Sequence, residues 1–347
     1  MRKVWFLGFL LSIFIVTGGC RKGKPNADWI GSERYVQKSV FECPYPDRGN
    51  LPFKLEASSF RHPSVVKEAK NGGIIGYFAP DILSNKRGES IVLKGVIGYG
   101  NGISLSSPLS DEYVSVWWYD GEKWKMIGRT LTDSDGNYNI EVPGEILEKW
   151  GNYRFYVFVE GDATCTTQLV MQHPEGSKFV ITDIDGTLTI DDNQVLLQLQ
   201  DPSYIPQSWD GAVDVMNGYA RKGYYIIYLT ARPRALDLLT KSWLIAEGYP
   251  EGAVHTATNF VYGESAARYK TEFLTHIVDD LGWKIVAAHG NAESDIEAYQ
   301  NAGVPDDRIF VIGENAGLNG STPVSNYKDF MNSDFYRNLP PAEQPDR

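Results

Sequence analysis

The sequence predicts an α/β fold, with a doubly wound parallel sheet, preceded by an all-β sandwich. After Pro174 the chain alternates between short β-branched apolar runs and amphipathic helical segments, which is typical of a parallel sheet covered by helices. Between residues 88 and 172 it consists instead of about seven short strand-like runs, as in a sandwich. Of the 347 residues, 42% are hydrophobic, which is enough to build two such cores.

The N-terminal residues differ in character from the rest of the chain. A basic start precedes an apolar run from Val4 to Val16, too short for a comfortable membrane span, so residues 1–19 are interpreted as a secretory signal. Thr-Gly-Gly before Cys20 resembles a bacterial lipobox, in which the cysteine is lipidated. A plain signal peptide cleaved near Gly19 is the alternative. Arg21, where an aspartate would favour the inner membrane, points to an outer-membrane lipoprotein on the periplasmic face.

Residues 20–84 are expected to form a polar tether and an irregular segment. An exported compartment permits disulfides, and the two remaining cysteines are Cys43 and Cys165. A bridge between them and two buried free thiols are both consistent with the sequence. The formal charge of -11 argues against a nucleic-acid partner, because phosphate binding needs a basic face.

The predicted sandwich spans residues 85–174. Asp-Gly pairs at 120–121 and 135–136 indicate hairpin turns between its strands. The aromatic residues from Trp117 to Trp124 suit a sandwich core and hairpin pairs, and a lipid-docking patch is the alternative.

The predicted α/β domain spans residues 175–332, and residues 333–347 are expected to be a tail, disordered from Asn338 onward. The segment 190–209, after the first strand, is too short to hold a large cap domain, so the site would be open to bulky substrates. The expected strands are KFVITDID, YYIIYLTAR, AVHTAT, KIVAAHG and RIFVIG, and the expected helices are GAVDVMNGYARKG, ALDLLTKSWLIAEG, ESAARYKTEFLTHIVDDLG and SDIEAYQNAG.

Polar side chains gather where these strands end. Asp183 ends the first strand and Asp185 lies just beyond it, while Thr230 ends the second. Lys270 lies on a later helix, and Asp295 follows the strand KIVAAHG. Ligands of open α/β sheets bind outside the carboxyl ends of the strands, so we expect these side chains to share one site. Carboxylates, a hydroxyl and a lysine suit a hard cation such as Mg2+ together with an oxyanion.

Four motifs carry a family resemblance. DIDGT, a hydroxyl after the second strand, a downstream lysine and GN-x3-D resemble, in this order, the motifs of the haloacid dehalogenase superfamily of phosphatases. More closely, DIDGTLT, YLTARP, RYKTEFL and AAHGNAESDIEAYQNAGVPDDRIFVIG resemble the catalytic domain of the lipins, which are Mg2+-dependent phosphatidate phosphatases. They also resemble the C-terminal domain of membrane-associated phosphatidylinositol-transfer (retinal degeneration B) proteins, to which GAVDVMNGYARKGYYIIYLTARP is especially similar. The resemblance covers roughly residues 175 to 330.

The resemblance implies a role for each residue. Asp183 would be the nucleophile that forms an aspartyl-phosphate, and Asp185 the general acid and then the general base. Lys270 would neutralise phosphate charge and hold Asp183. The other implied roles are substrate contacts by Gly186, Thr187, Thr230 and Arg232, support of the loop by Asn291, and Mg2+ binding by Asp183, Asp295 and the main-chain carbonyl of Asp185.

The resemblance therefore predicts a Mg2+-dependent phosphatase that converts phosphatidic acid to diacylglycerol and phosphate at a membrane, where a lipid anchor on Cys20 would hold it. One alternative is a module that binds phosphatidic acid without turnover, as implied by the phosphatidylinositol-transfer relatives, which carry a non-acid where this chain has Asp183. The other is a general periplasmic phosphomonoesterase. The acid at position 183 favours catalysis. The sequence does not predict the physiological substrate or the oligomeric state.

Overall fold

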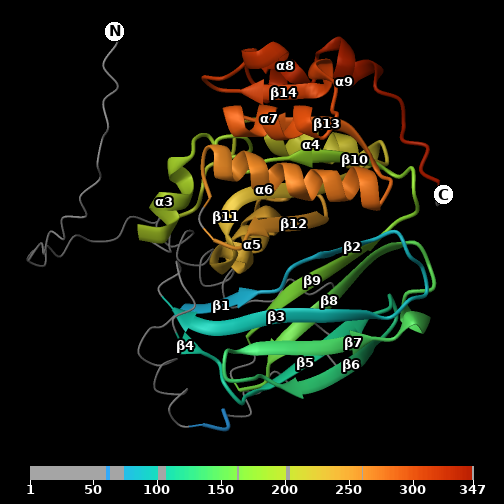
Figure 1. Cartoon of the computed structure of the whole chain (residues 1–347), viewed down its shortest axis with the longest axis vertical. Helices are drawn as coiled ribbons and strands as arrows, with labels where there is room; N and C mark the ends of the chain where they lie inside the picture. Colours follow the sequence, from blue (N-terminus) through green and yellow to red (C-terminus); the bar gives the residue numbers. More distant parts are fainter. Residues whose placement is uncertain are drawn as a thin grey trace, which may run out of the picture.

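The computed structural model describes residues 60–62, 74–100, 107–161, 164–200, 204–259 and 261–345. Within them, a β-rich part is stacked against an α/β part (Figure 1). The predicted signal segment, Cys20, Cys43 and most of the predicted tether lie outside the described residues. None of the helices in the described part of the chain is long and apolar enough to cross a membrane.

The β-rich part consists of two sheets. In the four-stranded sheet, β3 pairs with β1, β4 and β7, and the five-stranded sheet has the order β2-β9-β8-β5-β6. Leu93 and Tyr138 from the first sheet and Val116 and Val157 from the second are buried in one shared core, as expected of a sandwich. The strands are β1 (Ile74–Phe78), β2 (Ile82–Ser84), β3 (Ile91–Gly100), β4 (Ser107–Pro108), β5 (Tyr113–Tyr119), β6 (Trp124–Leu131), β7 (Asn137–Val142), β8 (Gly151–Val159) and β9 (Cys165–Gln172).

Strands β1 and β2 come from the segment that was expected to be irregular. Each pairs with a strand of the predicted sandwich, β1 with β3 and β2 with β9. The sandwich therefore begins earlier in the chain than residue 85. Cys165, at the start of β9, is disulfide-bonded, so it is not the free thiol of the alternative reading. Its predicted pairing with Cys43 stays a prediction.

The aromatic residues near Trp117 divide between core and surface layers of the sandwich. Trp124 is buried and packs edge-on against Tyr156, with ring centroids 4.9 Å apart. Tyr156 alternates along β8 with core residues such as Phe155, so this small aromatic cluster covers the face of the five-stranded sheet that points away from the shared core.

The α/β part contains a six-stranded sheet with the order β12-β11-β10-β13-β14-β15. Every neighbouring pair is parallel, as the alternation of strands and helices predicts. The chain adds strands on one side of β10 and then on the other, so the order reverses between β10 and β13, where open α/β sheets bind ligands. The strands are β10 (Lys178–Thr182), β11 (Tyr225–Pro233), β12 (Gly252–Ala257), β13 (Lys284–Gly290), β14 (Ile309–Ile312) and β15 (Thr322–Val324).

Helices cover both faces of this sheet, which confirms the doubly wound prediction. Val180 of β10 packs with α4, α5, α8 and α9, while its neighbours Phe179 and Ile181 point to the other face and pack with α6 and α7. The helices are α3 (Asn193–Gln200), α4 (Ala212–Arg221), α5 (Asp237–Glu247), α6 (Glu264–Thr275), α7 (Glu293–Asn301), α8 (Tyr327–Phe330) and α9 (Asp334–Asn338). The 3-10 helices are η1 (Gly144–Ile146), η2 (Arg234–Leu236), η4 (Asp306–Arg308) and η5 (Leu318–Gly320), and η3 (His276–Asp280) is a π-helix that follows α6.

The prediction of a disordered C-terminal tail is wrong for its described residues. Tyr336 and Leu339 are buried against the α/β core. The amide of Gln344 receives a hydrogen bond from the Lys178 N–H and donates one to the Lys178 carbonyl oxygen, both at 2.9 Å. The proline-rich composition of the segment suggested disorder. However, Leu339 packs in the α/β core and Gln344 forms hydrogen bonds with the first residue of β10, so the segment is held in place.

Candidate active site at the carboxyl end of β10

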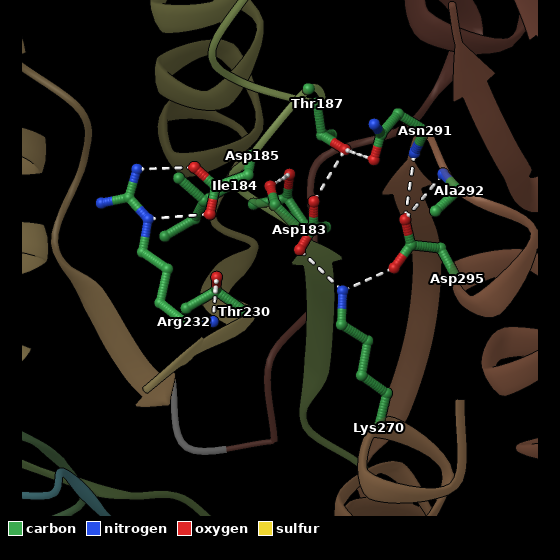
Figure 2. A network of polar contacts seen from close by, with 12 residues as sticks. Asp183, Ile184, Asp185, Thr187, Thr230, Arg232, Lys270, Asn291, Ala292 and Asp295 are labelled. Atoms are coloured by element: carbon green, nitrogen blue, oxygen red, sulfur yellow. Dashed lines mark hydrogen bonds and ion pairs between the residues drawn. The ribbon is translucent and has the colours of Figure 1, made fainter. Parts of the chain in front are cut away.

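The chain leaves β10 at Asp183, whose position is set by the neighbouring strand. The Asp183 N–H donates to the carbonyl oxygen of His289 in β13 at 2.9 Å, which extends the parallel ladder by one residue. The hydroxyl of Thr187, on the following turn, lies 3.1 Å from Asp183 Oδ2. The candidate nucleophile is therefore held by both the sheet and the turn (Figure 2).

Lys270 joins two aspartates from different loops, and we call Asp183, Lys270 and Asp295 the site cluster. Lys270 Nζ donates to Asp183 Oδ1 at 2.6 Å and to Asp295 Oδ1 at 2.5 Å. The other oxygen of Asp295 accepts the N–H groups of Asn291 and Ala292, at 3.1 and 3.0 Å, at the start of α7. All three side chains of the cluster are buried, and one ammonium between two carboxylates leaves an excess negative charge.

The surroundings shift the protonation of this cluster. Burial raises the pKa of Asp183 to about 7, although the nearby Lys270 charge acts in the opposite direction. For Lys270, burial lowers the pKa, but the charges of Asp183 and Asp295 outweigh it and the net shift is upward. The ionised form of Asp183 is therefore poorly stabilised by the protein alone, and a further positive charge beside it would favour that form.

Asp185 is held in a bidentate ion pair. Arg232 donates to its two carboxylate oxygens through Nε at 2.8 Å and through Nη2 at 2.7 Å. The third nitrogen, Nη1, donates to Thr240 Oγ1 at 3.1 Å, and the main-chain N–H of Arg232 donates to Thr230 Oγ1, also at 3.1 Å. The Arg232 side chain is 1% exposed and that of Asp185 18%, so a ligand reaches the aspartate first.

Two of the predicted substrate contacts thus have other partners here. The guanidinium of Arg232 faces Asp185, and the hydroxyl of Thr230 accepts from the main chain of Arg232. Neither geometry tests a role in substrate binding, which stays a prediction for both residues.

Gly186 lies where the loop after β10 meets the loop after β13. Its φ is +70°, a region that favours glycine. A Cβ atom there would lie 2.0 Å from Asn291 Nδ2 and 2.5 Å from Asp192 Oδ1, which are hydrogen-bonded to each other at 3.0 Å. Asn291 Oδ1 also lies 3.2 Å from the Thr187 hydroxyl, so Asn291 contacts both loops, and its supporting role stays a prediction. Sequence reasoning missed Asp192, although the acidic pair Asp191 and Asp192, separated from the DIDGT motif by three residues, was the available signal.

The residues present fit Mg2+ as the resemblance implies it. In the described ranges no group of three or more His, Cys, Asp or Glu side chains could hold a metal by itself. However, proteins usually hold Mg2+ with one or two carboxylates, and water and substrate phosphate supply the other ligands. Asp183 and Asp295 both contact Lys270 Nζ, so their carboxylates lie close enough together to offer hard oxygen donors to one cation. The Asp185 side chain faces Arg232, which leaves its main-chain carbonyl as the candidate ligand.

Comparison with known families adds to this geometry. Residues 180–313 match the family model described as PITM 1-3, LNS2 domain. The match runs from β10 to β14 and includes the whole site cluster, Asp185 and Arg232. It supports the predicted resemblance to the retinal degeneration B group of proteins.

Individual relatives agree with the LNS2 match. Over 237 residues the chain is 30% identical to membrane-associated phosphatidylinositol transfer protein 3 of Homo sapiens, which covers 68% of this chain and 23% of the relative. It is 28% identical over 192 residues to the protein retinal degeneration B of Drosophila melanogaster, which covers 55% of this chain and 14% of the relative. The chain therefore spans less than a quarter of the length of these relatives. A solved structure titled "Structure of PhoD" aligns with 45% of this chain and 26% of its own at 12% identity and a TM-score of 0.25, too low to support an argument.

Proposed function

We propose that the α/β part is a Mg2+-dependent phosphatase of the haloacid dehalogenase type that hydrolyses phosphatidic acid through an aspartyl-phosphate. The observation that carries this proposal is the convergence of the buried site cluster with Asp185 at the carboxyl end of β10 (Figure 2). A carboxylate nucleophile, a lysine that balances phosphate charge and a second acid for proton transfer are the parts that this chemistry needs.

The contacts of Asp183 indicate which of its oxygens attacks phosphorus. Oδ1 accepts from Lys270, while Oδ2 faces the Thr187 hydroxyl. We therefore assign Oδ2 as the attacking atom. Its bond to phosphorus forms as the bond from phosphorus to the leaving ester oxygen breaks, and Lys270 offsets the charge that develops on the phosphoryl oxygens.

Asp185 moves the proton in both half-reactions. Its protonated carboxyl gives a proton to the leaving alcohol oxygen, and the resulting carboxylate takes a proton from the water that attacks the aspartyl-phosphate. That second step releases phosphate and restores the Asp183 carboxylate. Because both oxygens of Asp185 accept from Arg232, this ion pair has to rearrange before Asp185 donates its proton. When bound, Mg2+ would be held by Asp183, Asp295 and the Asp185 carbonyl and would neutralise phosphate charge.

The direct test is phosphate release from phosphatidic acid in mixed micelles, by protein that begins after Cys20. We expect turnover with Mg2+, none with EDTA, and none by Asp183→Asn in either condition. A purified, folded protein that releases phosphate from no phosphomonoester in Mg2+ would overturn the proposal. Comparable rates on p-nitrophenyl phosphate and on lipid would instead identify a general phosphomonoesterase.

Binding of phosphatidic acid without turnover is the second candidate. It is favoured by the ion pair that engages both oxygens of Asp185, and by the relatives' description as phosphatidylinositol transfer proteins. Sedimentation with vesicles that contain phosphatidic acid, with no phosphate released, would support this candidate.

A location at the membrane is proposed from the predicted lipobox and from the membrane-associated relatives. Metabolic labelling with a radioactive fatty acid tests it in a bacterial host. We expect label on the wild-type chain and none on Cys20→Ser, and equal absence of label from both would contradict the anchor.

A further inference from the structure

Helix α5 belongs to both parts of the molecule. Leu238 is buried in the core of the β-rich part, whereas Trp243 and Leu244 are buried in the core of the α/β part. In Figure 1, α5 lies between β1 and the parallel sheet. A displacement of one part relative to the other would therefore move this helix.

A buried ion cluster attaches α5 to the β-rich part, and we call Asp81, Asp237 and Lys241 the interface cluster. Lys241 Nζ donates to Asp81 Oδ1 at 2.9 Å and lies 3.1 Å from Asp237 Oδ2. It also donates to the carbonyl oxygens of Ala79, at 2.6 Å, and Thr167, at 3.2 Å. All three ionised side chains are buried, so this end of α5 has little freedom to shift.

Asp81 holds three elements at once. Besides Lys241 in α5, its carboxylate accepts the N–H of Leu169 in β9 and the N–H of Val254 in β12, both at 2.8 Å. It therefore joins a strand of the sandwich to the edge strand of the parallel sheet. Removing one hydrogen-bonded charge from such a buried set leaves the other groups unsatisfied.

The neighbouring residue of α5 reaches the candidate active site. Thr240 is fully buried, and its hydroxyl accepts from Nη1 of Arg232 at 3.1 Å. The other two guanidinium nitrogens of Arg232 hold Asp185. The buried contacts of Asp81 with Lys241 and of Thr240 with Arg232 are thus joined by the backbone of α5, in which Thr240 and Lys241 are neighbours.

We propose that Asp81, Lys241 and Thr240 are positioning residues, through which the β-rich part fixes Arg232 and so orients the carboxyl of Asp185. The consequence for catalysis rests on the proposed function, whereas the mechanical coupling does not depend on it. The β-rich part is then a component of the site and not an independent attachment module. Hydrogen bonds to charged groups are the stronger ones in proteins, which makes such coupling effective.

The first test needs no catalytic activity. The Nε–H of Arg232 is buried and bonded to Asp185, so its 15N NMR signal should exchange slowly with solvent, and Arg232→Lys identifies that signal by removing it. We expect Asp81→Asn and Thr240→Val to speed this exchange at least about tenfold, while Thr240→Ser, which keeps the hydroxyl, leaves it unchanged. Unchanged exchange in folded Thr240→Val would overturn the link from α5 to Arg232. Unchanged exchange in folded Asp81→Asn would overturn the link from the β-rich part to α5.

The second test measures phosphate release by the same variants. We expect Asp81→Asn and Thr240→Val each to lower kcat about tenfold with KM within about twofold, and Thr240→Ser to restore most of kcat. Glu251→Gln is the matched control, because its ion pair with Arg154 also joins the two parts but does not involve α5. This control should keep wild-type kcat.

Three further outcomes test the coupling and separate it from the proposed function. If Asp81→Asn and Thr240→Val both act through α5 on Arg232, the double variant should lose about as much kcat as the worse single variant, and multiplied losses would contradict the proposal. A drop in Glu251→Gln equal to that in Asp81→Asn would also contradict it, since any weakening of the interface would then suffice. An inactive wild type with slow Arg232 exchange that Asp81→Asn accelerates would overturn the proposed function and leave the coupling intact.

Discussion

The site cluster and the interface cluster have the same composition, one lysine between two aspartates, and both are buried. In each, burial raises the pKa of one aspartate, Asp183 or Asp237, to about 7. In each, burial lowers the lysine pKa but the two carboxylates outweigh that effect. Judged by charge and burial alone, the two clusters are equally good candidates for a functional site.

The partners of the two lysines distinguish the clusters. In the interface cluster, Lys241 donates to two carbonyl oxygens as well as to carboxylate, and Asp81 accepts from two N–H groups. In the site cluster, the partners of Lys270 within the described residues are two carboxylates, and Asp183 Oδ2 faces one hydroxyl. An ammonium has three donors, so Lys270 has one left for a ligand, whereas carboxylate and carbonyl oxygens use those of Lys241. The aspartates do not differ in this way, because Asp295 also accepts two main-chain N–H groups and the buried Asp237 Oδ1 has no partner among the described residues. An unused lysine donor at the carboxyl end of a strand, and not buried charge, marks the candidate site.

The largest effect is expected from Asp183→Asn, which separates function from stability. Loss of the proposed nucleophile should lower kcat by about 10^4-fold. The free energy of unfolding should stay the same or increase, because burial disfavours the charged form of Asp183. Phosphate release and urea unfolding measure the two quantities, and a variant with near wild-type kcat would exclude Asp183 as the nucleophile.

Substitution of each lysine tests whether Mg2+ can replace the lost ammonium in the site cluster but not in the interface cluster. Lys270→Met and Lys241→Met each leave two buried carboxylates without their ammonium, which should cost about 3–5 kcal/mol of stability. Mg2+ should raise the Tm of Lys270→Met by more than it raises the Tm of the wild type. It should raise the Tm of Lys241→Met by no more than that of the wild type, because main-chain N–H groups already occupy Asp81 in the interface cluster.

Thermal unfolding in EDTA and in Mg2+ provides the comparison. Equal effects of Mg2+ on both variants would mean that the two clusters do not differ in their capacity for a ligand.

A smaller effect is expected from Gly186→Ala, which adds one methyl group beside the site cluster. The positive φ and the clash with Asn291 and Asp192 should move the loop after β10 and lower kcat about tenfold. Gly88→Ala is a control, since Gly88 also has a positive φ, +74°, but nothing lies within 4 Å of its Cβ position. If both variants keep wild-type kcat, close packing at position 186 is not needed.

The sequence was informative where the signal is local. The alternation of strands and helices predicted β10 to β14, and the DIDGT motif with the later lysine and aspartate predicted the members of the site cluster. Parallel strands bring their carboxyl ends together, so knowing the strands was enough to expect that convergence.

The remaining contacts depend on which distant segments meet. Lys241 and Asp81 are separated by 160 residues, and nothing in either neighbourhood indicates a partner. The Asp185 and Arg232 pair, 47 residues apart, was missed because both residues belong to motifs that suggested other roles. Strand β2 was missed because it has only three residues, and β1 because it follows the polar stretch KEAKNGG. Such features follow from tertiary packing and not from local pattern.

The smallest expected effect is a change in how stability depends on pH. An unfolded aspartate has a pKa of about 4, and burial raises that of folded Asp237 to about 7. A raised pKa in the folded state means that this group contributes stability that is fully present below about pH 4 and is lost as the pH rises through about 7. Asp237→Asn removes the titrating group, so its free energy of unfolding should fall less steeply than that of the wild type between these pH values.

Urea unfolding in EDTA at several pH values measures this slope, and Asp183→Asn should show the same direction of change in the site cluster. The two clusters should respond differently once Mg2+ is present. A cation beside Asp183 favours its ionised form and should remove the contribution of Asp183 to the pH dependence of the free energy of unfolding. The contribution of Asp237 should persist, because main-chain carbonyl groups surround Lys241 in the interface cluster. If the wild-type free energy of unfolding depends on pH in the same way with and without Mg2+, the site cluster does not bind this metal.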